Sequence, residues 1–483
     1  MSLQRFDTLI LGDDISGLVA ANLLTHFHYK VVVLRNSTPA DRYIYDGYTL
    51  PISPSVIPPL HYGELMSQIR QFFTLSQSEF DSEADIVEKF QFITKRLRLD
   101  ISINQDETIE EFLCELGIKR ENISRFIDVA RKAKERYIDA FNLHYPYPPY
   151  TFWDKRRIQK NIFAELNSNQ SILNLLDSEK GRAAFRTVLT FIQNLNTKNI
   201  LFSQDSLLGF IFSERWIILP SIERIKSTLI RRLEDKGVLI LNNTPNRYRV
   251  EKRGFNYYIR DERQHNSYRI ESILLAADRD FIASILEKKI FSRLNIKSFP
   301  YLIRYTTNFV VGIRCIPEMA SNLIYYKEDV VNSDVSQNYQ ISFTKAMRGR
   351  AIIKENRIIS VTTYIKPEEF NKKNVDILNQ RAKDILLRVF PFSDEYIVNI
   401  SSVLNAEILL DVNLNEIRRL DYKPSQYIFI TDEVQDGIML FDMKTGIDNF
   451  INSAYVFAPI GIFGDFMSAV RASEIISKNI LGK

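Results

Sequence analysis

The spacing of apolar positions changes twice within the first 35 residues. Residues 7–11 form a short apolar run that ends at Gly12, residues 18–24 are apolar at helical spacing, and residues 30–34 form a second apolar run. This change from strand-like runs to a 3.6-residue period and back predicts a strand, a helix and a strand. The chain therefore begins with a β-α-β unit of the kind that opens dinucleotide-binding domains.

Prolines and capping residues divide the next part of the chain. The prolines between residues 51 and 59 exclude a helix in that stretch. Thr108 followed by Glu111 has the spacing of a capping box, and residues 123–141 are rich in helix formers. The proline-rich stretch 145–150 ends this helical region, which favours a rigid connection between helices over a ligand for another protein.

A second helix and a meander follow in the middle of the chain. Residues 221–236 place four apolar side chains on one helical face, with Ser221 as a cap and Gly237 as a stop. The stretch 237–243 predicts a buried strand. Three alternating segments then predict an antiparallel meander that returns to a parallel sheet at residues 273–277.

From residue 299 onward the pattern becomes alternating and rich in aromatic residues, which predicts a second, sheet-based domain. A helix is expected over 375–389, a last buried strand over 454–459 and a closing helix over 466–481. Together the pattern predicts an α/β fold, with a Rossmann-like dinucleotide-binding domain and an interleaved second α+β domain of the substrate-binding type. The expected ranges are 1–80, 200–298 and 435–483 for the Rossmann domain, 81–199 for a helical insertion, and 299–434 for the sheet-based domain.

Composition narrows the class without naming an activity. Of the 483 residues 45% are hydrophobic and 25% are charged, as in ordinary globular proteins, and the net charge is +4. No long basic stripe predicts a nucleic-acid partner, and the two cysteines form no disulfide framework or metal motif. The start lacks the layout of a signal peptide and no apolar run is long enough to span a bilayer, so we expect a cytoplasmic protein. Peripheral membrane contact stays open, and residues 155–157 form a basic group that is either a solvated helix face or a patch for a partner or lipid headgroup.

Four stretches resemble the flavin-containing amine oxidase and phytoene desaturase superfamily. The opening "GDDISGLVAANLL" is similar to its glycine-rich FAD loop and helix, and "DGYTLPISPSVIP" to the turn that precedes its substrate region. Residues 219–252 resemble its helix, strand and hairpin that contact the adenosine half of the cofactor, and 454–481 its C-terminal strand and helix over the flavin ring. The resemblance implies a two-domain fold with a flavin site between the domains.

The residues at the implied cofactor site depart from the family pattern. In G-x-G-x-x-G the middle glycine lets the backbone approach the diphosphate, but here Asp14 lies between Gly12 and Gly17. Two like charges about 4 Å apart in a partly desolvated site repel by several kcal/mol. Arg35 replaces the acid expected to accept hydrogen bonds from the ribose, and Ala458 and Pro459 replace a Gly-Asp pair.

A further acid, Asp465, stands where the family uses the bare dipole of the last helix. Asp13, Asp14 and Asp465 are also ordinary helix N-cap residues, which is the simpler reading of each. The positions that the resemblance places around the cofactor are Gly12, Asp14, Gly17, Arg35, Gly461 and Gly464.

Three functions follow from this pattern. The leading prediction is a protein that keeps the flavoprotein fold, has lost standard FAD binding, and acts as an escort or subunit for a protein partner or as a carrier of an apolar molecule. The resemblance includes a precedent, the non-redox Rab escort and GDP-dissociation-inhibitor branch. The first alternative is an FAD-dependent oxidoreductase acting on an amine or an isoprenoid-like substrate in a cavity lined by Tyr301, Tyr305, Tyr325 and Tyr326. The second is an NADP-binding protein in which Arg35 holds the 2′-phosphate. The sequence predicts no metal site.

Overall fold

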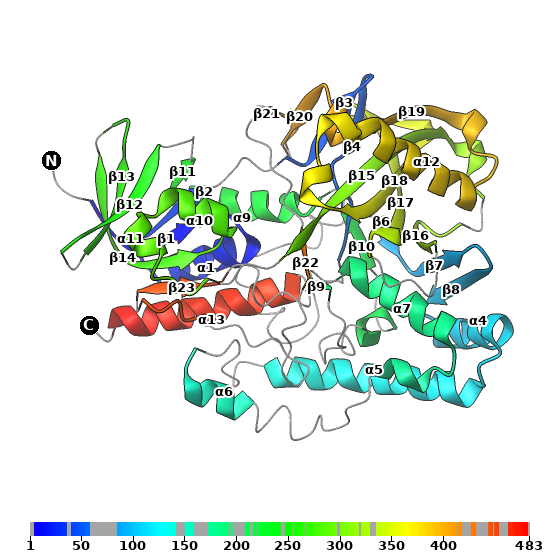
Figure 1. Cartoon of the computed structure of the whole chain (residues 1–483), viewed down its shortest axis with the longest axis horizontal. Helices are drawn as coiled ribbons and strands as arrows, with labels where there is room; N and C mark the ends of the chain where they lie inside the picture. Colours follow the sequence, from blue (N-terminus) through cyan, green and yellow to red (C-terminus); the bar gives the residue numbers. More distant parts are fainter. Residues whose placement is uncertain are drawn as a thin grey trace.

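A computed structural model describes most of the chain. The described residues are 4–35, 40–57, 85–141, 150–158, 172–192, 195–196, 208–212, 216–219, 221–242, 247–254, 256–264, 266–296, 300–317, 320–328, 335–411, 413–417, 427–430, 443–447, 449–453 and 462–481. Two sheets lie side by side. The last helix, α13 (Ile462–Leu481), and the long helix α5 (Arg120–Phe141) run beneath them in the view of Figure 1.

Among the described residues, seven strands form a mixed sheet, which includes the first and the last strand, β1 and β23. Its central strands are parallel because a β-α-β unit places β2 beside β1, with Thr8 opposite Val31, as the sequence predicts. The meander is also confirmed, since β12, β13 and β14 pair antiparallel and β14 then runs parallel to β1. In spatial order the strands are β11 (Leu239–Asn242), β2 (Val31–Arg35), β1 (Gln4–Leu11), β14 (Ser267–Leu275), β13 (Asn256–Asp261) and β12 (Tyr248–Arg253), with β23 (Phe450–Asn452) beside the end of β14.

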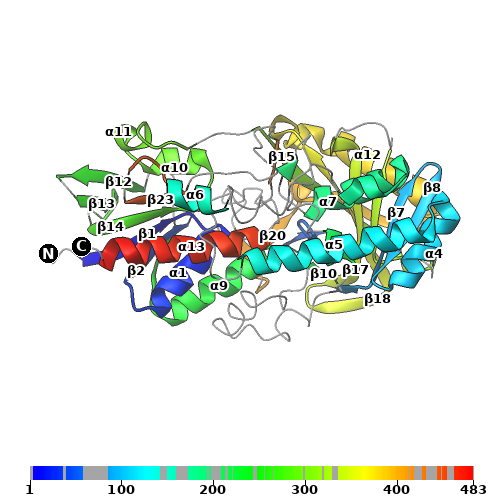
Figure 2. The same cartoon turned by 90° about the horizontal axis from the view of Figure 1, so that it is seen from below.

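Helices cover both faces of the seven-stranded sheet. On one face α1 (Ile15–His26) packs between α9 (Glu223–Asp235) and α13 (Ile462–Leu481), with which it shares one hydrophobic core. Figure 2 shows these three helices side by side, although they come from opposite ends and the middle of the chain. The other face packs against α10 (Arg279–Ile285) and α11 (Lys288–Phe291).

In the described part of the chain, thirteen strands form the second sheet, and α12 (Val375–Val389) covers one of its faces. The boundaries of α12 are those that the sequence predicts. The main path of the sheet is β21 (Glu416–Ile417), β20 (Ile408–Leu410), β3 (Arg42–Tyr45), β4 (Tyr48–Pro51), β17 (Asn338–Arg348), β18 (Ala351–Ile365), β15 (Tyr301–Gly312), β22 (Tyr427–Ile430) and β9 (Leu195–Asn196). The branches are β16 (Leu323–Lys327), β19 (Ile397–Ser402), β7 (Lys89–Thr94) and β8 (Leu97–Ser102).

The remaining described elements lie outside the two large sheets. Three strands form a small antiparallel sheet: β5 (Ser55–Ile57), β10 (Trp216–Leu219) and β6 (Asp85–Val87). The helices of this part are α4 (Gln105–Leu116), α5 (Arg120–Phe141), α6 (Phe152–Ile158) and α7 (Glu179–Ile192). Short 3-10 turns lie at Ile172–Leu175, Ile313–Cys315, Val335–Gln337, Pro367–Glu369, Lys372–Asn374, Asp394–Tyr396 and Val403–Asn405.

Several sequence expectations are corrected. The side chain of Asn104, rather than Thr108, caps α4, because the Thr108 hydroxyl bonds the backbone of Ser102 instead. Strands β3, β4, β7 and β8 belong to the 13-stranded sheet, although their ranges were expected in the Rossmann domain and the helical insertion. Among the described residues, β23 is the last strand of the seven-stranded sheet, and the expected strand 454–459 stays a prediction. That range, and residues 145–149, lie outside the described residues.

Candidate functional site

The turn between β1 and α1 is built on two glycines that lie in close contact with Ala276. Gly12 has φ +121°, and a Cβ there would lie 2.0 Å from the carbonyl oxygen of Ala276. At Gly17 a Cβ would lie 2.3 Å from the Cβ of Ala276. The end of β14 therefore packs so closely on this turn that only glycine fits at either position. The outer glycines of the expected fingerprint thus have the structural role that the sequence assigns to them.

Asp14 occupies the middle position of that fingerprint. It is the N-cap residue of α1, as predicted, with extended backbone angles (φ −66°, ψ 154°), but its side chain makes no capping hydrogen bond. Its backbone N–H donates to the carbonyl of Ala276 at 3.1 Å. The backbone N–H at the middle position of the turn is thus hydrogen-bonded within the chain, and the carboxylate of Asp14 does not cap the helix.

The carboxylate of Asp14 belongs to a group of charged side chains from four segments, which we call the acidic cluster: Asp13, Asp14, Glu223, Lys226, Asp278 and Asp465. Glu223 and Lys226 come from the first turn of α9, where their side chains form an ion pair with an N–O distance of 3.1 Å. Asp465 lies in the first turn of α13. Asp13, Glu223 and Lys226 are buried, at 6%, 5% and 7% exposure.

Burial and mutual charge shift the titration of this cluster. Burial raises the pKa of Asp14 well above its usual range; Lys226 opposes the shift, whereas Asp13, Asp465 and Asp278 reinforce it. Burial also raises the pKa of Asp465, to about 7, against the pull of Lys226. For Lys226 burial lowers the pKa, but Glu223, Asp13 and Asp14 outweigh it and hold the lysine protonated. One buried cation is thus surrounded by more acids than it can neutralise.

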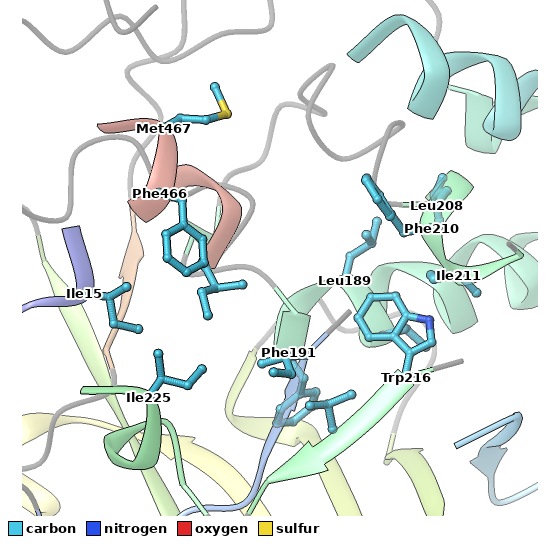
Figure 3. Packing of buried hydrophobic residues seen from close by; sticks show 14 of the residues in the cluster. Ile15, Leu189, Phe191, Leu208, Phe210, Ile211, Trp216, Ile225, Phe466 and Met467 are labelled. Atoms are coloured by element: carbon cyan, nitrogen blue, oxygen red, sulfur yellow. The ribbon is translucent and has the colours of Figure 1, made fainter. Parts of the chain in front are cut away.

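Apolar side chains pack beside the acidic cluster. Ile15 from α1, Ile225 from α9 and Phe466 from α13 lie close together (Figure 3), and their exposures are 5%, 1% and 1%. The three helix tips are therefore packed directly against one another. Such packing explains why the carboxylates lose solvent and why their pKa values rise.

The other candidate residues lie at the same edge of the seven-stranded sheet. Arg35 ends β2 opposite Asn242 and is 8% exposed. The preceding residue, Leu34, accepts a hydrogen bond from the N–H of Gly12 at 2.9 Å. Gly464 lies in the first turn of α13, where its carbonyl accepts from Ser468. The structure thus gathers Gly12, Asp14, Gly17, Arg35 and Gly464, whereas Gly461 lies outside the described residues.

These residues do not fit a dinucleotide held in the usual manner. A diphosphate needs donors and positive charge at the helix tip, and here carboxylates from α1, α9 and α13 surround that place. Arg35 carries only donors, so it offers no acceptor to a ribose diol. The retained parts of the Rossmann turn are those that pack helix on strand, and the altered parts are those that would touch a cofactor.

The tyrosines expected to line a substrate cavity do not share one site. Tyr325 and Tyr326 are neighbours on β16, so they point to opposite faces of the sheet. Tyr325 packs against Phe90 and Phe191, and Tyr326 packs against Tyr339 beneath α12. Strand alternation therefore contradicts the four-tyrosine cavity.

The face of the 13-stranded sheet that turns away from α12 carries a buried polar layer. Asn308 donates to the carbonyl of Pro51 at 2.6 Å, and Arg304 donates to that of Pro54 at 2.5 Å. Ser360 and the hydroxyl of Tyr43 also bond Asn308. These side chains supply hydrogen-bond donors to the carbonyls of Pro51 and Pro54. The prolines interrupt strand pairing in this segment, so some of its backbone groups need partners other than a neighbouring strand.

Sequence reasoning missed Glu223 and Lys226. A signal was available, because Lys226 lies four residues after Ile222 and three before Leu229, on the apolar face of α9. A charged residue within such a stripe is rarely buried unless it is paired. The partners of Lys226 come from distant segments, which sequence periodicity does not reveal.

The described residues contain no group of three or more acidic, histidine or cysteine side chains arranged to hold a metal ion. None of the helices in the described ranges is both long enough and apolar enough to cross a membrane.

Solved structures of oxidoreductases share this fold. Wild-type putrescine oxidase bound to putrescine matches with a TM-score of 0.53 and 13% identity, over 99% of each chain. A triple mutant of putrescine oxidase matches with a TM-score of 0.56 and 13% identity, over 99% of this chain and 100% of that one. An oxidoreductase from Methanosarcina mazei matches with a TM-score of 0.53 and 11% identity, over 97% of this chain and 100% of that one.

At such identities the likeness establishes the fold alone. A Rab GDI from Plasmodium falciparum is more distant, with a TM-score of 0.45 and 12% identity, and bears on neither fold nor function. No protein-family model and no curated protein matches the sequence.

Proposed function

We propose that the chain is a non-redox binding protein built on the FAD oxidoreductase fold, acting as an escort or subunit for a protein partner or as a carrier of an apolar molecule. The observation that carries the proposal is the acidic cluster at the tips of α1, α9 and α13. A dinucleotide held in the usual manner would place its diphosphate at the tip of α1, and these carboxylates and Lys226 lie around that tip.

The energetic argument depends on charge at the helix tip. A carboxylate charge and a phosphate charge about 4 Å apart repel by about 4 kcal/mol at an effective dielectric of 20. Protonation of Asp14 and Asp465 lessens this repulsion and gives each carboxyl group an O–H donor, but it supplies no positive charge for a diphosphate. A diphosphate would have to displace the ion pair of Glu223 and Lys226 or force further protonation of the cluster.

The proposal is tested with the absorption spectrum of the purified protein after incubation with excess FAD and removal of free cofactor. We expect a colourless protein with unchanged thermal stability, because a ligand that binds only the native state must raise the unfolding temperature. Flavin absorbance that stays with the protein would overturn the proposal and favour the FAD-dependent oxidoreductase.

The same thermal measurement addresses the NADP alternative. Arg35 lies at the end of β2, where an arginine accommodates a 2′-phosphate in some Rossmann domains. If Arg35 held such a phosphate, NADPH but not NADH would stabilise the protein. We expect neither nucleotide to do so, because the acidic cluster opposes both diphosphates equally.

A further inference from the structure

Two large aromatic side chains are exposed next to each other on α6. Phe152 and Trp153 are each 69% exposed, and their rings form an edge-to-face pair with centroids 5.6 Å apart. Among the large hydrophobic residues that the structure describes, they are the only exposed pair adjacent in sequence. Exposed aromatic residues that gather in this way mark interaction sites, whereas single ones do not.

The α6 segment is fixed to the body of the protein, so the pair is held in place. The carboxylate of Asp154 accepts from the N–H groups of Tyr150 and Thr151 at 3.1 and 3.0 Å. The Thr151 hydroxyl accepts from the N–H of Asp154 at 3.1 Å. Arg471 of α13 forms an ion pair with Asp154 at 3.0 Å. Asp154 thus anchors α6 inward while the neighbouring aromatic rings face solvent.

The exposed side of α6 is also positively charged. Arg156 and Arg157 are exposed and lie four residues after Phe152 and Trp153, and Lys155 precedes them in the sequence. Asp154 is the one acid between residues 150 and 158. Burial raises its pKa, but the hydrogen bonds and Arg471 outweigh this effect and lower the pKa, so Asp154 stays ionised and paired with Arg471. The surface that remains combines aromatic rings with arginines.

We propose that α6 binds the surface of an anionic lipid bilayer, with Phe152 and Trp153 at the headgroup level and Arg156 and Arg157 on lipid phosphates. Aromatic residues favour this interface, and arginines near it are attracted to anionic lipids. A protein groove would instead be recognised by apolar residues three and four positions apart along a helix. Two consecutive aromatic residues on a seven-residue helix present a tip rather than such a stripe. This inference does not depend on the proposed function.

Trp153 reports its own environment. The chain has two tryptophans, and the other, Trp216, is buried at 3% exposure. In a Trp216→Phe variant the emission of Trp153 is therefore isolated. We expect it to shift to shorter wavelength and to be quenched by brominated lipids when vesicles of phosphatidylcholine and phosphatidylserine are added. Unchanged emission with both would overturn the proposal.

Vesicle co-sedimentation of the full chain tests the two halves of the surface. The double variant Phe152→Ser/Trp153→Ser should lose roughly 100-fold in affinity, because two large apolar side chains no longer leave water. The double variant Arg156→Ala/Arg157→Ala should lose about 25-fold on anionic vesicles, since each basic residue contributes a factor of about five. The arginine variant should differ little from wild type on phosphatidylcholine alone.

Matched controls come from exposed residues elsewhere. Phe392, in the turn after α12, is 85% exposed, and Lys95 and Arg96 lie in the exposed turn after β7. Phe392→Ser and Lys95→Ala/Arg96→Ala should bind vesicles as the wild type does. The proposal is wrong if the α6 variants and these controls bind equally. It is also wrong if the wild type does not bind the vesicles, and that result would favour a protein partner for this surface.

Discussion

Single side chains at the tip of α1 separate packing from binding. Gly12 and Gly17 keep the residue type that close contact with Ala276 demands. Asp14 lies between them, where packing demands nothing of its side chain, and there the sequence departs from the dinucleotide pattern. Packing therefore explains the two glycines but not Asp14, and the proposed loss of cofactor binding concerns Asp14.

The titration of Asp465 gives a prediction at this scale. Burial raises its pKa from 3.8 to about 7, so the native state holds a proton that the unfolded chain releases. The free energy of unfolding should therefore fall as the pH rises from about 4 to about 7. In Asp465→Asn this dependence should weaken, and the variant should be about 2 kcal/mol more stable than wild type at pH 8, allowing for partial solvent contact.

Urea unfolding of both proteins across this pH range measures the difference. Equal stability at pH 8, or a wild type that gains stability toward neutral pH relative to the variant, would contradict the buried position of Asp465. The difference should vanish near pH 4, where both side chains are neutral.

At the scale of elements, the packing of α1 on β14 depends on the Gly12 turn. Gly12→Ala should destabilise the protein by at least about 3 kcal/mol, because the methyl group meets backbone and φ is positive. Gly237→Ala is the matched control, since Gly237 has φ +72° and nothing within 4 Å of its Cβ. It should cost only about 1 kcal/mol. Chemical denaturation compares the two, and equal costs would show that the turn tolerates a side chain.

The two sheets are joined by a buried ionic contact. Asp41, next to β3, is fully buried; it accepts from Ser221 at 2.8 Å and pairs with Arg42 at 3.3 Å. Arg224 of α9 lies 3.8 Å away. Because Ser221 and Arg224 begin the helix that packs on the seven-stranded sheet, Asp41 fixes α9 against the 13-stranded sheet.

Asp41→Ala should lower the free energy of unfolding by about 3–5 kcal/mol, because it leaves arginines buried without this carboxylate. The exposed pair of Glu110 and Arg120 provides the comparison, and Glu110→Ala should cost less than about 1 kcal/mol. Thermal unfolding of both variants measures the costs. A small effect at Asp41 would mean that the sheets do not depend on this contact.

At the scale of the whole molecule, local patterns predicted local structure. The β-α-β unit, the meander and helix α12 followed from hydrophobic periodicity and glycine positions. The 13-stranded sheet did not, because β7 pairs with β16 and β3 with β20 across long stretches of sequence. No local pattern specifies such partners.

The candidate site divides in the same way. The sequence identified the glycines and Asp14 because a six-residue motif, Gly12 to Gly17, defines the turn. It could not identify Lys226 as their neighbour, since only tertiary packing brings α9 and α13 to the tip of α1. The whole molecule thus assembles a charged site from segments that are unremarkable separately.

The affinity for FAD, measured by calorimetric titration of the full chain at neutral pH, tests the central claim most directly. The account predicts no saturable binding, with a Kd weaker than about 1 mM. A micromolar Kd, with flavin fluorescence quenched in the complex, would contradict it, because the diphosphate would then rest among carboxylates that should repel it.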